Sequence, residues 1–118
     1  MSKIAIIGAG DVGTTIAYTL QLSGLVTEIV LVDINQELVQ GQVMDLNHGL
    51  FFVRPVHIYA GTYADCTDAD VIVITAGTRQ KPGESRLQLV NRNAHICKRI
   101  VEKIGPDNSA GIFLIVTN

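Results

Sequence analysis

The stretch that most constrains the fold of this chain joins an apolar run to a glycine-rich turn, over residues 4–13 with the sequence IAIIGAGDVG. A run of four apolar residues is typical of a strand that is buried on both faces of a parallel sheet. The glycines at Gly8, Gly10 and Gly13 then allow a sharp turn, a close approach of a pyrophosphate to the main chain, and tight packing of the following helix. Free N–H groups at the start of that helix favour an anion. The stretch therefore predicts a strand, a phosphate-binding turn and a helix.

An acidic residue at the end of the second apolar run supports this interpretation, because a three-glycine turn alone is a weak signal. The run at 29–32 ends at Asp33, twenty residues beyond Gly13. A carboxylate at this place accepts hydrogen bonds from the hydroxyls of a ribose and repels a 2′-phosphate. Because Ile34 follows it, and not an arginine, the sequence favours NAD over NADP as cofactor. Asp33 could also be a plain carboxylate at the end of a strand.

The rest of the chain alternates between apolar runs and helical patterns. Strands are expected at 4–8, 28–33, 56–60, 71–74 and 112–116, and helices at 11–23, 36–47 and 84–104. The run at 71–74 is apolar at every position, which indicates a central strand. This order predicts an α/β fold, a doubly wound parallel sheet of about five strands in the order 3-2-1-4-5, with right-handed crossovers.

Two of the expected helices carry features that packing must explain. The helix at 84–104 has one apolar stripe of Leu87, Val90, Ala94, Cys97, Val101 and Ile104, and a second of Leu89, Ile96 and Ile100. We expect a helix this apolar to be covered on more than one side. Gly41, inside the helix at 36–47, costs about 1 kcal/mol relative to alanine and indicates either close packing or a weak point.

Composition narrows the functional classes. With 118 residues, 47% of them hydrophobic, the chain is expected to form one domain over 1–118, with apolar surface left for another domain or for a homo-oligomer. Its net charge of −2 and the lack of a basic stripe argue against nucleic acid and anionic membranes as partners. No apolar run approaches the ~18 residues of a membrane span, and the N-terminus is unlike a signal peptide, so a cytoplasmic location is expected.

The cysteines and histidines are expected to be structural. Cys66 and Cys97 have no second cysteine or histidine at ligand spacing, which predicts two reduced thiols and no metal site. His48, His57 and His95 fall at a helix end, at the start of a strand and within a helix. A structural or solvent-facing role is favoured for each over proton transfer.

Several short blocks, taken together, resemble the N-terminal part of an L-lactate dehydrogenase, in the family that also includes the malate dehydrogenases. The blocks are Gly8 to Gly13, Val32-Asp33, Met44-Asp45-Leu46, Asp68-Ala69-Asp70, Thr75-Ala76-Gly77, Gln80 to Arg86, and Val116-Thr117-Asn118. They follow one another in the order of the family along the whole chain. The resemblance implies a Rossmann fold, NAD as cofactor, and hydride transfer between NADH and pyruvate or L-lactate in the full-length enzymes.

The resemblance also implies a set of cofactor-binding residues. From the pyrophosphate turn to the nicotinamide end, these are Gly8, Gly10, Asp11, Val12, Gly13, Asp33, Tyr63, Ala76, Gly77, Thr78, Val116 and Asn118. Tyr63 matches the residue that flanks the adenine, although it could simply cover an edge of the sheet. Asp11 departs from the pattern, because its charge would compete with phosphate for the N–H groups of the turn; a modest weakening is expected.

Substrate contacts are implied for three residues. Arg86 resembles the arginine of a mobile loop that closes over the substrate, where its planar cation polarises a ketone oxygen. Gln80 matches the position that reads the substrate's side chain, and a neutral glutamine there favours pyruvate and lactate over a dicarboxylate. Asn118 resembles an asparagine that contacts substrate and nicotinamide. Without the resemblance, Arg86 would be a surface arginine and Gln80 an ordinary loop residue.

The family's remaining catalytic groups are not expected in this chain. By the resemblance, a further domain supplies a sixth strand, the acid–base histidine with its aspartate, and the arginine that grips the substrate carboxylate. Three functions therefore stay open: part of a lactate dehydrogenase, a nucleotide-binding module without turnover, and a module that self-associates through an uncovered sheet edge. We expect weak NADH binding and no useful pyruvate reduction by these 118 residues.

Overall fold

A five-stranded parallel sheet in the order β3-β2-β1-β4-β5 is the centre of the computed structural model, which describes residues 2–108 and 110–117. The strands are β1 (Lys3–Ile7), β2 (Glu28–Val32), β3 (His57–Ala60), β4 (Val71–Ile74) and β5 (Ile112–Ile115). The helices are α1 (Asp11–Ser23), α2 (Gln36–His48) and α3 (Arg86–Ile104), with short 3₁₀ turns η1 (Leu50–Phe52), η2 (Tyr63–Cys66) and η3 (Gly105–Asp107). The fold class and the strand order predicted from the sequence are confirmed.

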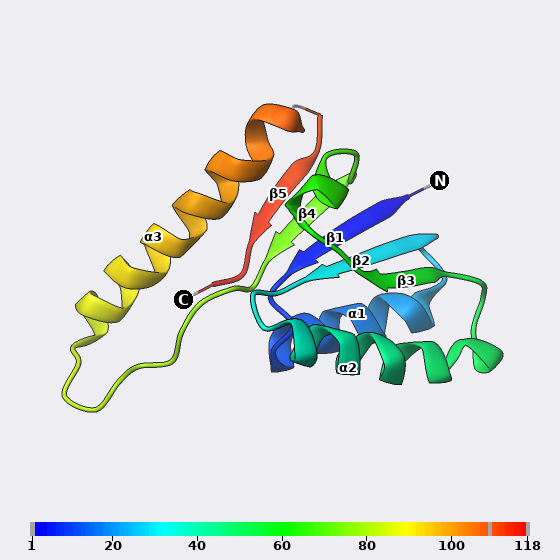
Figure 1. The fold of residues 1–118 in the computed structure, drawn as a ribbon, viewed down its shortest axis with the longest axis horizontal. Helices are drawn as coiled ribbons and strands as arrows, with labels where there is room; N and C mark the ends of the chain where they lie inside the picture. The colour runs from blue at the N-terminus through cyan, green and yellow to red at the C-terminus, as the bar shows by residue number, and fades with distance from the viewer. Residues whose placement is uncertain (1, 109, 118) are drawn as a thin grey trace.

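The helices form a layer on each face of the sheet (Figure 1). On one face, Ile6 and Leu31 pack in a core with residues of α1 and α2, such as Ala17 and Val39. On the other face, neighbouring strand residues pack against α3, as Ile7 does in the cluster that holds Ile104. The central strands β1, β2 and β4 are largely apolar because their buried residues meet one or the other of these two layers, whereas most of the edge strand β5 is exposed.

The structure adds one short element and moves one limit. The stretch 62–70, between the strands expected at 56–60 and 71–74, is not only a loop but contains η2, which Thr62 and Asp65 stabilise as a capping box. The last helix begins at Arg86, two residues after its expected start, because Ser85 is its N-cap and accepts a hydrogen bond from the backbone of Gln88. The other helix and strand limits agree with the predicted ones within one residue.

The expected cover over α3 is found for only part of its first stripe: Cys97, Val101 and Ile104 pack in the core, but the start of that stripe is exposed. Leu87 is 70% exposed and Val90 is exposed as well, whereas Leu89, Ile100 and Ile104 are buried. The reason is geometric, because α3 lies on the sheet with one face and its first turns extend beyond the strands (Figure 1). Only the face that meets the sheet is therefore covered within the described residues.

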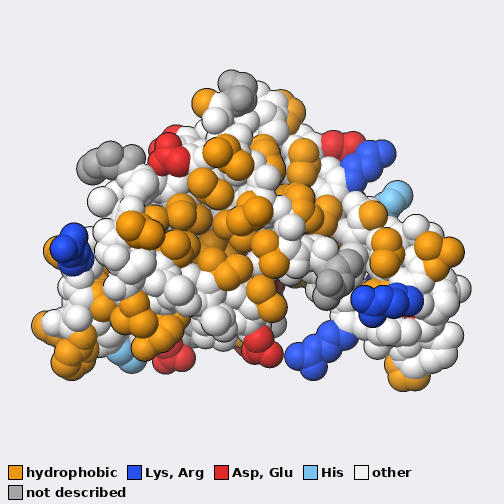
Figure 2. Space-filling model, turned by 180° about the vertical axis from the view of Figure 1, so that it is seen from behind, with side chains coloured by type: hydrophobic (Ala, Val, Ile, Leu, Met, Phe, Trp, Pro, Cys, Tyr) orange, Lys and Arg blue, Asp and Glu red, His pale blue; other side chains and the backbone are white. Residues whose placement is uncertain are grey.

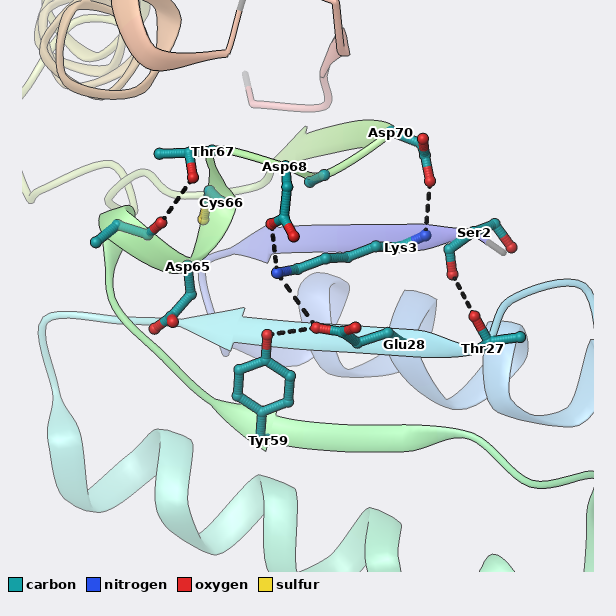
Figure 3. A network of polar contacts seen from close by, with 12 residues as sticks. Ser2, Lys3, Thr27, Glu28, Tyr59, Asp65, Cys66, Thr67, Asp68 and Asp70 are labelled. Atoms are coloured by element: carbon teal, nitrogen blue, oxygen red, sulfur yellow. Dashed lines mark hydrogen bonds and ion pairs between the residues drawn. The ribbon is translucent and has the colours of Figure 1, made fainter.

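A polar network joins the amino ends of the strands (Figure 3). The Lys3 Nζ atom lies 2.6 Å from Asp68 Oδ1 and 3.2 Å from Glu28 Oε2, and the Tyr59 hydroxyl donates to Glu28 Oε2 at 2.6 Å. The hydrogen bond from Tyr59, with that from Lys3, lowers the pKa of Glu28 below its ordinary value. The network ties β1, β2, β3 and the segment before β4 together, and it leaves the carboxyl ends of the strands free for a ligand.

Candidate functional site

A cleft of about 880 Å³ opens at the carboxyl ends of the strands. It lies where the strand order reverses, between β1 and its neighbours β2 and β4, which is where open α/β sheets bind ligands. Its volume is in the range of small-molecule and cofactor sites. The predicted site residues that line it are Gly8, Gly10, Asp11, Val12, Gly13, Asp33, Tyr63, Ala76, Gly77, Thr78, Gln80 and Val116. Arg86 is not among the lining residues, and Asn118 lies outside the described residues.

The three glycines of the turn are in different environments. Gly8 has a φ of +109°, and a Cβ added there would lie 2.9 Å from the Ala76 backbone nitrogen. A Cβ on Gly13 would collide with the backbone oxygen of Gly8, so the first turn of α1 sits directly on the end of β1. Gly10 differs, because nothing lies within 4 Å of a Cβ added to it. Two of the glycines thus serve close packing, and the third leaves open space beside the main chain.

The start of α1 faces this open space. Gly10 is the N-cap residue, and its position lacks a side-chain hydrogen bond to the first turn of the helix. The first N–H groups of a helix have no partner within the helix, and they carry the positive end of its dipole. An anionic group in the cleft would therefore find donors at this turn.

The carboxylate of Asp33 is fixed beside the same turn. Its Oδ2 accepts a hydrogen bond from the backbone N–H of Ala9 at 2.7 Å, and its Oδ1 accepts one from the backbone N–H of Asn35 at 2.9 Å. Each carboxylate oxygen can accept a second hydrogen bond. The structure thus brings Asp33 and the glycine turn together, and it leaves the carboxylate able to accept from a ligand hydroxyl.

The far end of the cleft carries two cations that the sequence analysis did not single out. Arg99 and Lys103 line it from α3, on the same side as Tyr63. The Lys103 Nζ atom lies 5.3 Å from the centre of the Tyr63 ring, within the range of a cation–π contact. Desolvation by burial raises the pKa of Tyr63 above its ordinary value, so the phenol is neutral at physiological pH. The four-residue spacing of the two cations was the only signal in the sequence.

The side chain of Asp11 points toward a cation at the rim of the cleft. Its Oδ2 atom lies 3.6 Å from the guanidinium of Arg79, and both side chains are 95% exposed. An exposed pair of this kind contributes little to stability. Arg79 nevertheless partly balances the negative charge that the sequence analysis expected to oppose a phosphate.

The side of the cleft formed by residues 75–80 depends on a buried amide. Asn93 of α3 accepts a hydrogen bond from the backbone N–H of Thr78 at 2.9 Å through its Oδ1 atom. Its Nδ2 donates to the backbone oxygen of Thr78 at 3.3 Å. Asn93 is not among the residues predicted from the sequence, although a polar residue at helical spacing between Leu89 and Ile96 was a usable signal.

The remaining candidates do not form a second site among residues 2–108 and 110–117. Cys66 is buried, and desolvation raises the pKa of its thiol to about 11, as for a packing residue. His48, His57 and His95 are all outside the lining of the cleft. In the described ranges no group of three or more histidine, cysteine, aspartate or glutamate side chains is placed to hold a metal ion. Nor does this part of the chain hold a helix with the length and apolar character to cross a membrane.

The chain is similar to known proteins over nearly its whole length. A family model described as lactate/malate dehydrogenase, NAD binding domain, matches residues 2–118. The L-lactate dehydrogenase of Acetivibrio thermocellus is 54% identical over 118 residues, which cover 100% of this chain and 37% of that protein. The L-lactate dehydrogenase of Clostridium botulinum strain Loch Maree is 52% identical over 117 residues, which cover 99% of this chain and 37% of that protein.

Solved structures of lactate and malate dehydrogenases have the same fold as this chain. A lactate dehydrogenase from a Medee basin deep-sea metagenome library has a TM-score of 0.94 at 47% identity. The malate dehydrogenase of Picrophilus torridus has a TM-score of 0.91 at 35% identity, and each of the two matches covers 99% of this chain and 38% of the solved chain. The chain thus spans a little over a third of the length of its relatives. Because the family model matches it almost from end to end, the chain belongs to the NAD-binding domain family of the lactate and malate dehydrogenases.

Proposed function

We propose that this chain binds NAD(H) in the cleft and serves as the cofactor-binding part of an L-lactate dehydrogenase-like oxidoreductase. The observation that supports this most is the position of Asp33, whose carboxylate is hydrogen-bonded to the backbone of the glycine turn at 2.7 Å. In this arrangement the turn and the start of α1 take the pyrophosphate, and Asp33 takes the hydroxyls of the adenosine ribose. Tyr63 lies at the adenine end, and Ala76, Gly77, Thr78 and Val116 line the nicotinamide end.

The substrate contacts belong to the same proposal. Gln80 lines the cleft, and as a neutral residue it suits a substrate without a second carboxylate, such as pyruvate or lactate. Arg86 begins α3 at the end of the same loop, from which its cation would polarise the ketone when the loop closes. Asn118 would contact substrate and nicotinamide. The named relatives are L-lactate dehydrogenases, in line with this substrate class.

Turnover needs more than these residues. A ketone that accepts hydride must also receive a proton, and loss of a positioned acid costs ~10²–10⁴-fold in rate. None of His48, His57 and His95 lines the cleft as described. We therefore propose that the 118-residue chain binds NAD without efficient reduction of pyruvate, which requires the remainder of a full-length enzyme.

Replacement of Asp33 by asparagine tests the cofactor assignment. The wild-type chain is expected to bind NADH more tightly than NADPH, because a 2′-phosphate would meet the Asp33 carboxylate. In Asp33→Asn the affinity for NADH is expected to fall about 10- to 100-fold, since a hydrogen bond to a charged group contributes about 1.5–3 kcal/mol. The preference for NADH over NADPH should narrow as well. Isothermal titration calorimetry with both nucleotides measures both effects.

Glu37→Gln is the matched control for this substitution. Glu37 lies in the first turn of α2, is exposed, and is not part of the cleft lining. The substitution Glu37→Gln removes one negative charge from the same part of the molecule and should leave the affinities for NADH and NADPH unchanged. Equal affinities of wild type and Asp33→Asn for NADH would refute the ribose assignment, and no heat with millimolar NADH would refute binding by this chain.

A second function, self-association, is favoured by the apolar surface beside β5. Ile112 is 66% exposed, and Leu114 and Ile115 are about half exposed on the outermost strand. Figure 2 shows hydrophobic side chains gathered in the middle of one side of the molecule. An edge strand with such side chains is a template for pairing with another chain.

Sedimentation velocity tests the homo-oligomer. The wild-type chain is expected to sediment as a dimer or larger species at high micromolar concentration. Ile112→Lys should sediment as a monomer, because a charge on an edge strand opposes pairing. A wild-type chain that stays monomeric over the whole concentration range would exclude this function.

A further inference from the structure

The segment between β4 and α3, residues 75–85, has no helix or strand of its own and extends away from the body of the molecule (Figure 1). Its middle part, residues 79–83, is exposed. The segment nevertheless lines the cleft with residues 75–80 and leads to Arg86. Contacts with α3 hold the two ends of this loop in the structure.

The guanidinium of Arg92, on α3, makes three of these contacts. Its Nε donates to the Thr78 hydroxyl at 2.7 Å, and its Nη2 donates to the Arg79 backbone oxygen at 2.9 Å. Its Nη1 donates to Glu84 Oε1 at 2.6 Å. All three nitrogens of the planar group are thus used on the two ends of one loop. Lysine, with a single nitrogen, could not reproduce this arrangement.

Glu84 extends the anchor into the middle of the loop. Its Oε2 accepts a hydrogen bond from the Lys81 backbone N–H at 2.8 Å, and its backbone oxygen accepts one from Gln80 Nε2 at 2.6 Å. The side chain of Glu84 is only 10% exposed and that of Arg92 28% exposed, so the pair is largely shielded from water. A shielded, hydrogen-bonded pair contributes more than a surface pair, and loss of one partner is costly.

We propose that Arg92 is a positioning residue, which holds Thr78 and Arg79 in place and so presents an ordered wall to the nicotinamide half of a bound dinucleotide. The inference rests on the proposed function, because it takes NAD(H) as the ligand. It concerns only one half of the cleft: the contacts of Arg92 are to residues 78, 79 and 84, whereas Asp33 and Tyr63 at the adenosine half are held by other elements.

The experiment measures the affinities of two ligands, AMP and NADH, for wild type and for the variants Arg92→Ala, Arg92→Lys and Lys98→Ala. AMP occupies only the adenosine half, and NADH occupies both halves. In Arg92→Ala we expect the NADH affinity to fall about tenfold, because NADH must then also order residues 78 and 79, and the AMP affinity to stay within about twofold. Arg92→Lys should bind NADH as weakly as Arg92→Ala, because lysine keeps the charge but lacks the planar group with three nitrogen donors. Lys98→Ala, an exposed cation on the same helix, should behave as wild type.

Limited trypsin digestion tests the anchor without a nucleotide. The bond after Arg79 is exposed in the loop, and Arg92 holds its carbonyl oxygen. Cleavage after Arg79, followed by mass spectrometry, should be several-fold faster in Arg92→Ala than in wild type or Lys98→Ala. Circular dichroism under the same conditions verifies that the variant is folded.

The outcomes separate the inference from the proposed function. A selective loss of NADH affinity together with faster cleavage supports the positioning role. Equal losses of NADH and AMP affinity, or unchanged NADH affinity, would overturn it, as would an unchanged cleavage rate in a folded variant. If wild type binds neither NADH nor AMP, the proposed function fails; the cleavage rates still decide whether Arg92 anchors the loop.

Discussion

Replacement of Gly13 by alanine is expected to lower the free energy of unfolding by about 3 kcal/mol or more. Its Cβ would collide with the backbone oxygen of Gly8 and would lie 2.9 Å from the Thr75 hydroxyl. Overpacking typically costs about 1–3 kcal/mol, and here the main obstacle is backbone that cannot rotate away. To make room, α1 must shift from the end of β1, which would disturb the packing of Ala17 in the core. Urea unfolding followed by circular dichroism measures the loss.

Gly41→Ala is the matched control for this prediction. Both substitutions place the same methyl group in a helix, but nothing lies within 4 Å of a Cβ added at Gly41, which is exposed on α2. The open space around Gly41 argues against close packing there, so of the two explanations that the sequence left open, the structure favours a weak point in the helix. Gly41→Ala should therefore raise the free energy of unfolding by up to about 1 kcal/mol. If Gly13→Ala is as stable as wild type, the contact between the turn and α1 is not as the structure has it.

The parts of the fold that could be predicted from the sequence are those whose signals are local. The apolar runs and the glycine spacing defined the parallel sheet, and the distance from Gly13 to Asp33 placed the carboxylate at the turn, where it is hydrogen-bonded to Ala9. Such signals depend on residues that are close in sequence or on a fixed order of strands. Their success does not test the roles of the individual residues in cofactor binding, which stay predictions.

The contacts that could not be predicted join residues that are distant in sequence. Arg92 and Asn93 are polar residues in a helical pattern, and only the tertiary structure shows that they hold Thr78 and Arg79, more than ten residues away. The burial of α3 was misjudged for the same reason. Leu87 is as apolar as Leu89, but Leu87 is 70% exposed and Leu89 is buried. Hydrophobic periodicity gives the apolar faces of a helix, and the neighbouring elements decide which of them is covered.

Replacement of Gly10 by alanine is expected to affect the ligand and not the fold. Gly10 has a φ of −75°, which alanine adopts freely, and a Cβ added there meets nothing within 4 Å. The free energy of unfolding should fall by less than about 1 kcal/mol, the cost of alanine in place of glycine at an N-cap. The methyl group would, however, stand where the proposed function has a pyrophosphate approach the main chain. We expect the NADH affinity to fall about 10- to 100-fold, as when one charge-assisted hydrogen bond is lost.

Adenosine, which carries no phosphate, is the control ligand for this prediction. Its weaker affinity should be the same in wild type and Gly10→Ala, because the proposed function places its contacts at Asp33 and Tyr63, which line the cleft. Calorimetry with NADH and adenosine, together with urea unfolding, separates a blocked phosphate site from a damaged fold. Unchanged NADH affinity in Gly10→Ala would mean that the phosphates do not approach this turn. A loss of stability equal to that of Gly13→Ala would mean that the open space beside Gly10 is absent from the folded protein, and that all three glycines serve packing alone.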